Sequence, residues 1–157
     1  EEFPHTAYAT LACFDFPKIN IKACEQLAEV DHPGSGYAKH NLGYSYEFGE
    51  SGYKQSYADA FYWYLRAANQ GLQRSQHNLA RMYEFGLGIQ KSHEIAYRLY
   101  RKASDQGCNK SFERAAILTL VELNRQVERG ITPYETKLEF MSLLEPWQIK
   151  EANNYFN

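Results

Sequence analysis

The sequence predicts an all-α fold built from stacked, antiparallel helix pairs. A stretch of about 35 residues occurs twice in succession, which is typical of repeat architectures. Within each copy, apolar residues recur at the spacing of one helical face, and a glycine follows each apolar run, as it does where a helix ends. The 157 residues suffice for one domain with a substantial core.

Composition and charge narrow the function classes. Aromatic residues make up 15% of the chain, with 13 Tyr, 9 Phe and 2 Trp, and residues of this kind supply the burial that a disordered chain lacks. The 17 Lys and Arg against 19 Asp and Glu give a formal net charge of −2, so no basic surface for nucleic acid is indicated. No run approaches the ~20 apolar residues of a stable membrane span.

The N-terminal segment, residues 1–36, is expected to be irregular or a short helix up to residue 18. A helix over 19–30 follows, with Ala23, Leu27 and Val30 on one face. The residues at 31–34, Asp-His-Pro-Gly, then break it. This helix is expected to be the second helix of an incomplete leading repeat.

The two clear repeats occupy residues 37–71 and 72–107. In the first copy, Ala38, Leu42 and Tyr46 recur every four residues, and Gly49 then ends the predicted helix. One extra residue in the first copy falls in the loop 50–56, where an insertion costs little. The matched residues of the two copies are Leu42 and Leu79, Tyr46 and Tyr83, Gly49 and Gly86, Ala60 and Ala96, Tyr64 and Tyr100, Ala67 and Ala103, and Gly71 and Gly107.

Residues 108–157 are predicted to hold a degenerate repeat and capping helices. The stretch 111–127 is similar to a third first helix, with Ala115, Ala116 and Leu118 as candidate core, but it lacks the Tyr and the closing Gly at the expected positions. One further helix is expected after Thr132-Pro133, and another near Pro146, carrying Trp147, Ile149 and Tyr155. These helices would cap the end of the stack.

The repeat residues resemble the Sel1-like repeat family, which is related to the tetratricopeptide repeats. Copy two departs from the family pattern at Ala80 and Ser104, where Gly and Ala are usual, and both changes replace one small residue by another. The resemblance implies a right-handed solenoid of helix pairs with a concave inner surface, and a protein-interaction scaffold. The first copy carries the pattern at Ala38, Leu42, Gly43, Tyr46, Gly49, Ala60, Trp63, Tyr64, Ala67, Ala68 and Gly71, and the second at Leu79, Tyr83, Gly86, Gly88, Ala96, Tyr100, Ala103 and Gly107.

The resemblance also implies more specific functions. Some small secreted bacterial members are similar to immunity proteins that neutralise a toxin of the type VI secretion system. The expected function is therefore non-catalytic binding of another protein, most specifically occlusion of a toxin's active site, in the periplasm or otherwise outside the cytoplasm. The start at Glu1 fits either a removed secretion signal or a trimmed chain. An envelope assembly or signalling scaffold, a small secreted repeat hydrolase and a cytoplasmic location are the alternatives.

The candidate partner-binding residues are those offset from the packing positions on the first helix of each copy, where aromatic and Arg side chains are typical interface anchors. Phe48 and Phe85 precede the helix-ending glycines, and we expect them in the core under the loop. The repeated glutamates have an alternative role in supporting the helix or a neighbouring Arg. The candidates are Tyr37, His40, Tyr44, Glu47, Arg74, His77, Arg81 and Glu84.

No catalytic motif, cofactor site or metal site is predicted. His40 and His77 lie in different repeats, whose helices pack about 8–10 Å apart, whereas zinc needs nitrogens at about 2.0–2.1 Å. His32 and His93 are expected in loops. Within the aromatic run 61–64, Trp63 and Tyr64 are expected in the core and not on a base-stacking platform.

The three cysteines leave one choice open. Cys13 and Cys24 would close a short disulfide loop in an oxidising compartment and would stay thiols in the cytosol. Cys108 is expected to be a small packing residue at a helix end.

Overall fold

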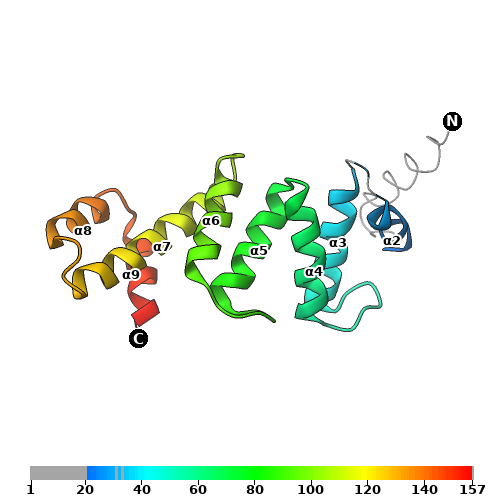
Figure 1. Cartoon of the computed structure of the whole chain (residues 1–157), viewed down its shortest axis with the longest axis horizontal. Helices are drawn as coiled ribbons and strands as arrows, with labels where there is room; N and C mark the ends of the chain where they lie inside the picture. The colour runs from blue at the N-terminus through cyan, green and yellow to red at the C-terminus, as the bar shows by residue number, and fades with distance from the viewer. Residues whose placement is uncertain (1–20, 31, 33, 157) are drawn as a thin grey trace.

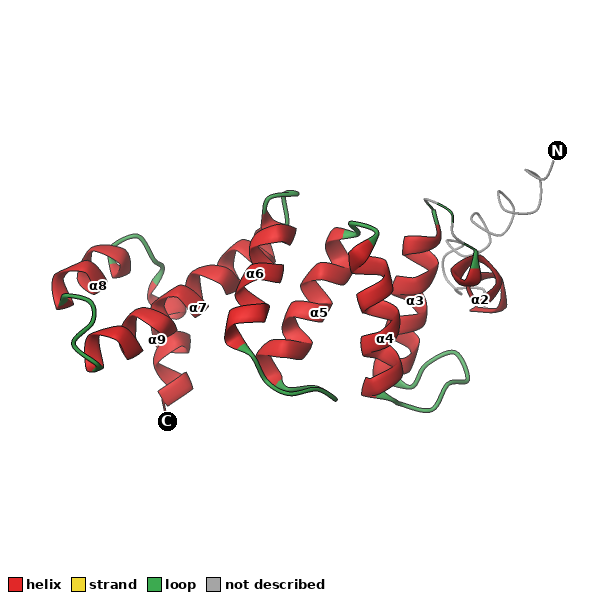
Figure 2. Cartoon of the chain, viewed as in Figure 1, coloured by secondary structure: helices red, strands yellow, loops and turns green. Residues whose placement is uncertain are grey.

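The computed structural model describes residues 21–30, 32 and 34–156 of the chain. In these ranges every regular element is a helix, which confirms the predicted all-α solenoid (Figures 1 and 2). Cys13 lies outside the described residues, and with it the possible Cys13–Cys24 disulfide that the sequence left open; Cys24 itself is buried. The helices are α2 (Ile21–Glu29), α3 (Ser35–Phe48), α4 (Tyr57–Asn69), α5 (Gln73–Phe85), α6 (His93–Ser104), α7 (Asn109–Glu128), α8 (Tyr134–Met141), α9 (Pro146–Asn153) and the short 3-10 helix η1 (Asn154–Phe156).

The helix pairs α3–α4 and α5–α6 form where the repeats predict them. Gly49 and Gly86 take left-handed backbone angles, with φ of 69° and 72°, and end α3 and α5 as expected. The helices α4 and α6 begin at equivalent serines, since the Ser56 and Ser92 hydroxyls accept hydrogen bonds from backbone N–H groups in the first turn. The extra residue of the first copy lies in the loop between α3 and α4.

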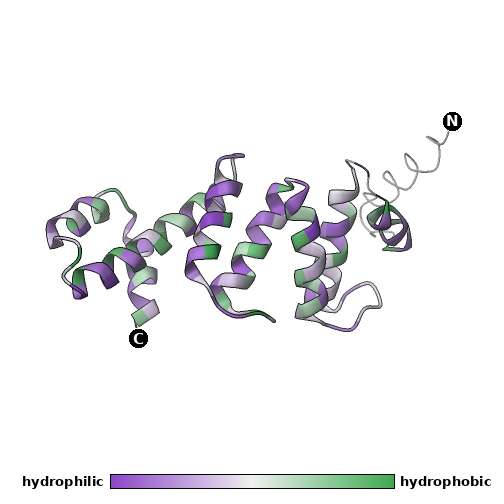
Figure 3. Ribbon diagram, viewed as in Figure 1, coloured by the Kyte–Doolittle hydropathy of each residue, from purple (hydrophilic) through white to green (hydrophobic). Residues whose placement is uncertain are grey.

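The core forms successive layers along the stack. Tyr64 and Tyr100 are fully buried at equivalent positions of α4 and α6, and alanines beside them allow close helix packing. Ala80, which replaces the usual Gly, is buried without disturbing this arrangement. Figure 3 shows apolar and hydrophilic residues interspersed around the helices, as expected when each helix buries one stripe.

Three local expectations are corrected by the structure. The buried stripe of α2 holds Cys24, Leu27 and Ala28, whereas Val30 follows the helix and is exposed. His93 is the first residue of α6 and does not lie in the preceding loop. Trp63 is only partly buried, against the core residues of α2 and α3, although Tyr64 is buried as expected.

The C-terminal part departs from the repeat pattern. Glu122 stands at the position of the closing Gly86, so α7 continues to Glu128 with no turn. The helix α9 packs on α7 through Ala152, against Ile117 and Val121 among others, and η1 follows it. Among the described residues, no helix is both long and apolar enough to cross a bilayer.

Candidate functional site

The predicted partner-binding residues divide into an exposed group and a buried group. Tyr37 and Tyr44 on α3 are 43% and 39% exposed, and Arg74 on α5 is also exposed. His40, His77 and Arg81 are partly buried. The structure therefore brings only some of the predicted set to the surface. The exposed side chains on these two helices, together called the α3/α5 face, are Tyr37, Tyr44, Phe48, Arg74 and Phe85.

Phe48 and Phe85 are not core residues, contrary to the sequence-based expectation. Each is 51% exposed. The residue before each phenylalanine, Glu47 or Glu84, points inward, which turns the aromatic ring outward at the last position of its helix. In the second copy, Leu87 beyond the glycine packs into the core in place of the phenylalanine.

The rings of Tyr44 and Phe48 pack against each other on α3, with centroids 4.5 Å apart. Their spacing of four residues places both on one side of the helix. The ring of Phe85 on α5 lies beneath the guanidinium of Arg114 on α7, with 5.6 Å between the guanidinium and the ring centre. A cavity of about 360 Å³ lies between Tyr37 and Arg74. The α3/α5 face therefore combines ordered aromatic rings with cations and a hollow.

Glu47 and Glu84 are unavailable to a partner, because they are 2% and 0% exposed. The Tyr64 hydroxyl donates to Glu47 at 2.9 Å, and the Tyr100 hydroxyl donates to Glu84 at 2.6 Å. Such buried carboxylates need paired charges, and each has an arginine from the next first helix. These glutamates are thus internal anchors, which corrects their prediction as surface contacts.

The arginines that pair with these glutamates link successive repeats. Arg81 on α5 pairs with Glu47 on α3, and Arg114 on α7 pairs with Glu84 on α5. Arg81 therefore belongs largely to the interior network, although its side chain is 29% exposed. Burial and the neighbouring Glu47 raise the pKa of Tyr64 above its ordinary value, so Tyr64 remains a hydrogen-bond donor.

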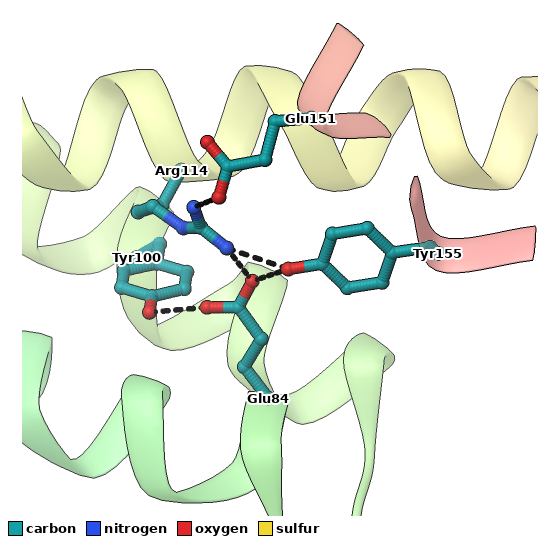
Figure 4. A network of polar contacts seen from close by, with 5 residues as sticks. All are labelled: Glu84, Tyr100, Arg114, Glu151 and Tyr155. Carbon is teal, nitrogen blue, oxygen red and sulfur yellow. Dashed lines mark hydrogen bonds and ion pairs between the residues drawn. The ribbon is translucent and has the colours of Figure 1, made fainter. Parts of the chain in front are cut away.

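The network around Glu84 also holds the C-terminal end of the chain. Figure 4 shows Tyr100, Arg114 and Tyr155 converging on the Glu84 carboxylate, with Glu151 on the far side of the guanidinium. Burial alone would lower the pKa of Arg114, but its bonds to Glu84 and Glu151 raise it overall. The guanidinium therefore stays charged, and α7, α9 and η1 are joined to the second repeat through it.

His40 and His77 bridge neighbouring first helices. Nδ1 of His40 forms a hydrogen bond with the Ser75 hydroxyl at 2.9 Å, and Nδ1 of His77 forms one with the Ser111 hydroxyl at 2.8 Å. Burial, and then the charge of Arg74, lower the pKa of His40 to about 4. The pKa of His77 is lowered as well, first by burial. Both imidazoles are therefore neutral near pH 7 and serve the repeat interface.

The described residues contain no group of three His, Cys, Asp or Glu side chains placed to hold a metal ion. The ion pairs confirm the alternative role of the repeated glutamates beside a neighbouring Arg, whereas sequence reasoning missed the tyrosines that join them. The available signal was the shared repeat of Glu47 with Tyr64 and of Glu84 with Tyr100, separated by 17 and 16 residues. Arg81 and Arg114 do not occupy equivalent repeat positions, so no sequence period marked them as partners.

Comparison with known proteins agrees with this architecture. Residues 36–72 and 73–108 match the Sel1 repeat. A Sel1 repeat protein from Oxalobacter formigenes is similar in structure, with a TM-score of 0.59 and 28% identity over 71% of this chain and 84% of that one. A protective antigen present in uropathogenic Escherichia coli strains, displaying an SLR fold, has a TM-score of 0.58 and 25% identity over 94% of this chain and 30% of that one.

The chitin synthase regulator SKT5 of Saccharomyces cerevisiae is 40% identical over 55 residues. That match covers 35% of this chain and 8% of the yeast protein, so the chain spans only a small part of its curated relative. Sel1 repeats mediate protein–protein interaction and form non-catalytic scaffolds. Residues 36–72 and 73–108 are thus two consecutive matches to the Sel1 repeat, and they lie within an all-helical solenoid.

Proposed function

We propose that this chain is a non-catalytic binding module that holds another protein on its α3/α5 face. The observation that carries the proposal is the equivalent exposure of Phe48 and Phe85, which are both 51% exposed at matching positions of the two repeats. A single exposed aromatic is ordinary, but exposed rings on neighbouring first helices are typical of an interaction surface.

The other residues of this face support a protein partner. Tyr44 and Phe48 already pack together, so little side-chain freedom is lost when a partner covers them. Arg74 and Tyr37 line the adjoining cavity and bring a cation and an aromatic ring to it. Aromatic and arginine side chains account for much of the binding energy at protein interfaces.

The buried polar groups of the repeats support binding rather than catalysis. Glu47 and Glu84 are paired with arginines, and His40 is partly buried and bonded to Ser75. These groups hold the helices in place, and their charges and hydrogen bonds are already paired with other residues of the fold. Such interior anchoring gives the α3/α5 face a rigid base.

Site-specific photo-crosslinking tests the proposal. Benzoylphenylalanine replaces Tyr44 in one variant and the exposed Tyr62 of α4 in a matched control. In extract from the source organism, the variant at position 44 is expected to form a discrete protein adduct, and the control is not. Equal adducts from both variants, or an adduct from position 62 alone, would place the interface elsewhere.

In its narrowest form, the proposal is a bacterial immunity protein whose α3/α5 face covers the active site of a secreted toxin outside the cytoplasm. A rigid aromatic and cationic surface is suited to blocking access to an active site without chemistry of its own. Co-purification with the product of the adjacent gene, followed by an assay of that product's activity, tests this form. An envelope scaffold would instead bind several proteins and leave their activities unchanged.

A further inference from the structure

A second candidate binding surface, separate from the α3/α5 face, lies between α6 and α7. A cavity of about 880 Å³ opens there, within the ~300–1,000 Å³ typical of ligand sites. It is lined by the first half of α6, by the second half of α7 and by Tyr155 of η1. None of the α3/α5 residues borders it, so it is independent of the proposed function.

The preceding repeat junction, between α4 and α5, shows which residues fill the place that corresponds to this cavity. There, the loop after α5 folds back on the start of α4: Leu87 and Ile89 pack into the core, and Gly88 lies against Tyr57. A Cβ atom on Gly88 would lie 2.6 Å from the Tyr57 Cβ, so the loop backbone is in direct contact with α4. Two aliphatic side chains on a bent segment, with Gly88 at a φ of 70° between them, thus close the first junction.

The second junction lacks both parts of this closure. Glu122 replaces the turn-forming Gly86, so α7 runs straight on and no loop folds back onto α6. Thr119 replaces Tyr83, whose ring packs edge-on against Phe61 at 5.8 Å in the first junction. Thr119 and Tyr97, the counterpart of Phe61, both line the cavity. The cavity is therefore the unfilled equivalent of a closed repeat junction.

The charges around the cavity favour a carboxylate at one end. Glu94 is paired with Arg98 at 2.6 Å, and Glu122 lies 3.8 Å from Arg125. Lys91 has no ion pair in the described part of the chain, and its ammonium group lies 5.8 Å from the centre of the Tyr155 ring. After burial, the charges of Lys91 and Arg125 lower the pKa of His93, and the smaller opposing effects of Glu84 and Glu122 do not offset them.

We propose that this cavity binds a short segment of a partner protein that carries two aliphatic residues two positions apart, next to a carboxylate. The aliphatic pair takes the place that Leu87 and Ile89 take in the first junction. The carboxylate lies toward Lys91 and Arg125. The site makes the last repeat junction a second point of attachment, separate from the α3/α5 face.

The probe is an acetylated pentapeptide that copies residues 85–89, Phe-Gly-Leu-Gly-Ile, with a free C-terminal carboxylate. It is titrated into the ¹⁵N-labelled full chain, and backbone amide shifts are followed by NMR. The expected shifts are concentrated at 91–97 and 118–126. A peptide with serine in place of both aliphatic residues is expected to bind at least tenfold more weakly, and a C-terminal amide about threefold more weakly.

Thr119→Tyr restores the aromatic ring of the first junction and is expected to weaken peptide binding at least tenfold. Thr136→Tyr, on an exposed position of α8, is the matched control and is expected to leave binding unchanged. Lys91→Glu changes an exposed side chain and tests the charge even where Thr119→Tyr disturbs folding. It is expected to weaken binding of the peptide with a free C-terminal carboxylate threefold or more, and binding of the peptide with a C-terminal amide less.

Amide shifts centred outside the cavity, or equal binding by a folded Thr119→Tyr variant, would overturn the proposal. A concentration-dependent dimer that Thr119→Tyr abolishes would assign the cavity to a second copy of the chain and would also overturn it. Peptide binding is expected to persist in Tyr44→Ala, so failure of the proposed function and failure of this inference are distinguishable.

Discussion

Removal of the Arg114 guanidinium is expected to be the most destabilising single change of a charged residue outside the apolar core. Arg114→Met keeps much of the side-chain volume but leaves the Glu84 carboxylate without its cation. Glu84 is fully buried, and Arg114 itself is 18% exposed. Breaking a buried ion pair costs about 3–5 kcal/mol, and the partial exposure of Arg114 favours the lower end, about 3 kcal/mol.

Part of that loss is moderated by the remaining hydrogen bonds. Tyr100 and Tyr155 still donate to Glu84, and the carboxyl can take up a proton instead of remaining charged. Glu84→Gln, combined with Arg114→Met, removes the carboxylate that has lost its cation. The double variant is therefore expected to be less destabilised than the sum of the single changes, by about 1.5 kcal/mol or more.

Urea unfolding at pH 7, followed by circular dichroism at 222 nm, measures these differences. With a slope of about 2 kcal/mol per molar urea, a loss of about 3 kcal/mol lowers the midpoint by about 1.5 M. Arg98→Met is the matched control, because the Arg98–Glu94 pair is 75% and 74% exposed and is worth less than about 0.5 kcal/mol. If Arg114→Met costs no more than this control, the interior network does not hold the repeats together.

Three further predictions follow from the same contacts. Because the pKa of His40 is lowered to about 4, the unfolded chain binds a proton below pH 6.5 that the folded chain does not bind until about pH 4. The free energy of unfolding is therefore expected to fall by about 2 kcal/mol between pH 7.5 and pH 5. Urea titrations of His40→Gln at the two pH values are expected to show a smaller fall. Gly88→Ala meets Tyr57 at 2.6 Å and has a positive φ of 70°, so calorimetry is expected to show a larger loss than for Gly107→Ala, which has a positive φ but open space; equal losses would contradict the close loop contact. Phe48→Ser is expected to change the free energy of unfolding by less than about 0.5 kcal/mol, whereas the buried Leu42→Ala costs about 2–5 kcal/mol, and a comparable cost for both would return Phe48 to the core.

The fold was predictable because its determinants are local and repeated. Gly49 and Gly86 take positive φ angles at matching positions, and Tyr64 and Tyr100 are buried at matching positions, so the period alone placed four helices. The end of α7 was also predictable, because the absence of a closing glycine left the helix expected over 111–127 uninterrupted, and α7 spans Asn109–Glu128.

The candidate site was predictable only in part. Helical spacing placed Tyr37 and Tyr44 on the surface side of α3, and both are exposed. Spacing did not show that Glu47 is buried and Phe48 exposed, because the burial of Glu47 depends on the arginine that α5 supplies from 34 positions away. Burial of a charge is decided by such distant partners, which no local pattern contains.

The position of Arg81 also determines which variants can test binding. Arg81→Ala would leave Glu47 buried without its cation, so a loss of binding would include a loss of stability. Phe85 is a better partner for Tyr44 in a double variant, because both rings are exposed and neither is the counter-ion of a buried carboxylate, although Arg114 lies over the Phe85 ring.

The most direct measurement of the central claim is calorimetric titration of the partner protein that is crosslinked at position 44. It is titrated with two double variants of this chain, Tyr44→Ala/Phe85→Ala and Tyr62→Ala/Tyr134→Ala. All four positions hold an exposed tyrosine or phenylalanine. The account predicts that the first double variant loses about 2 kcal/mol or more of binding free energy, roughly 30-fold in affinity, while the second binds like the unaltered chain. Unchanged affinity in the first variant, or an equal loss in both, would contradict binding through the α3/α5 face.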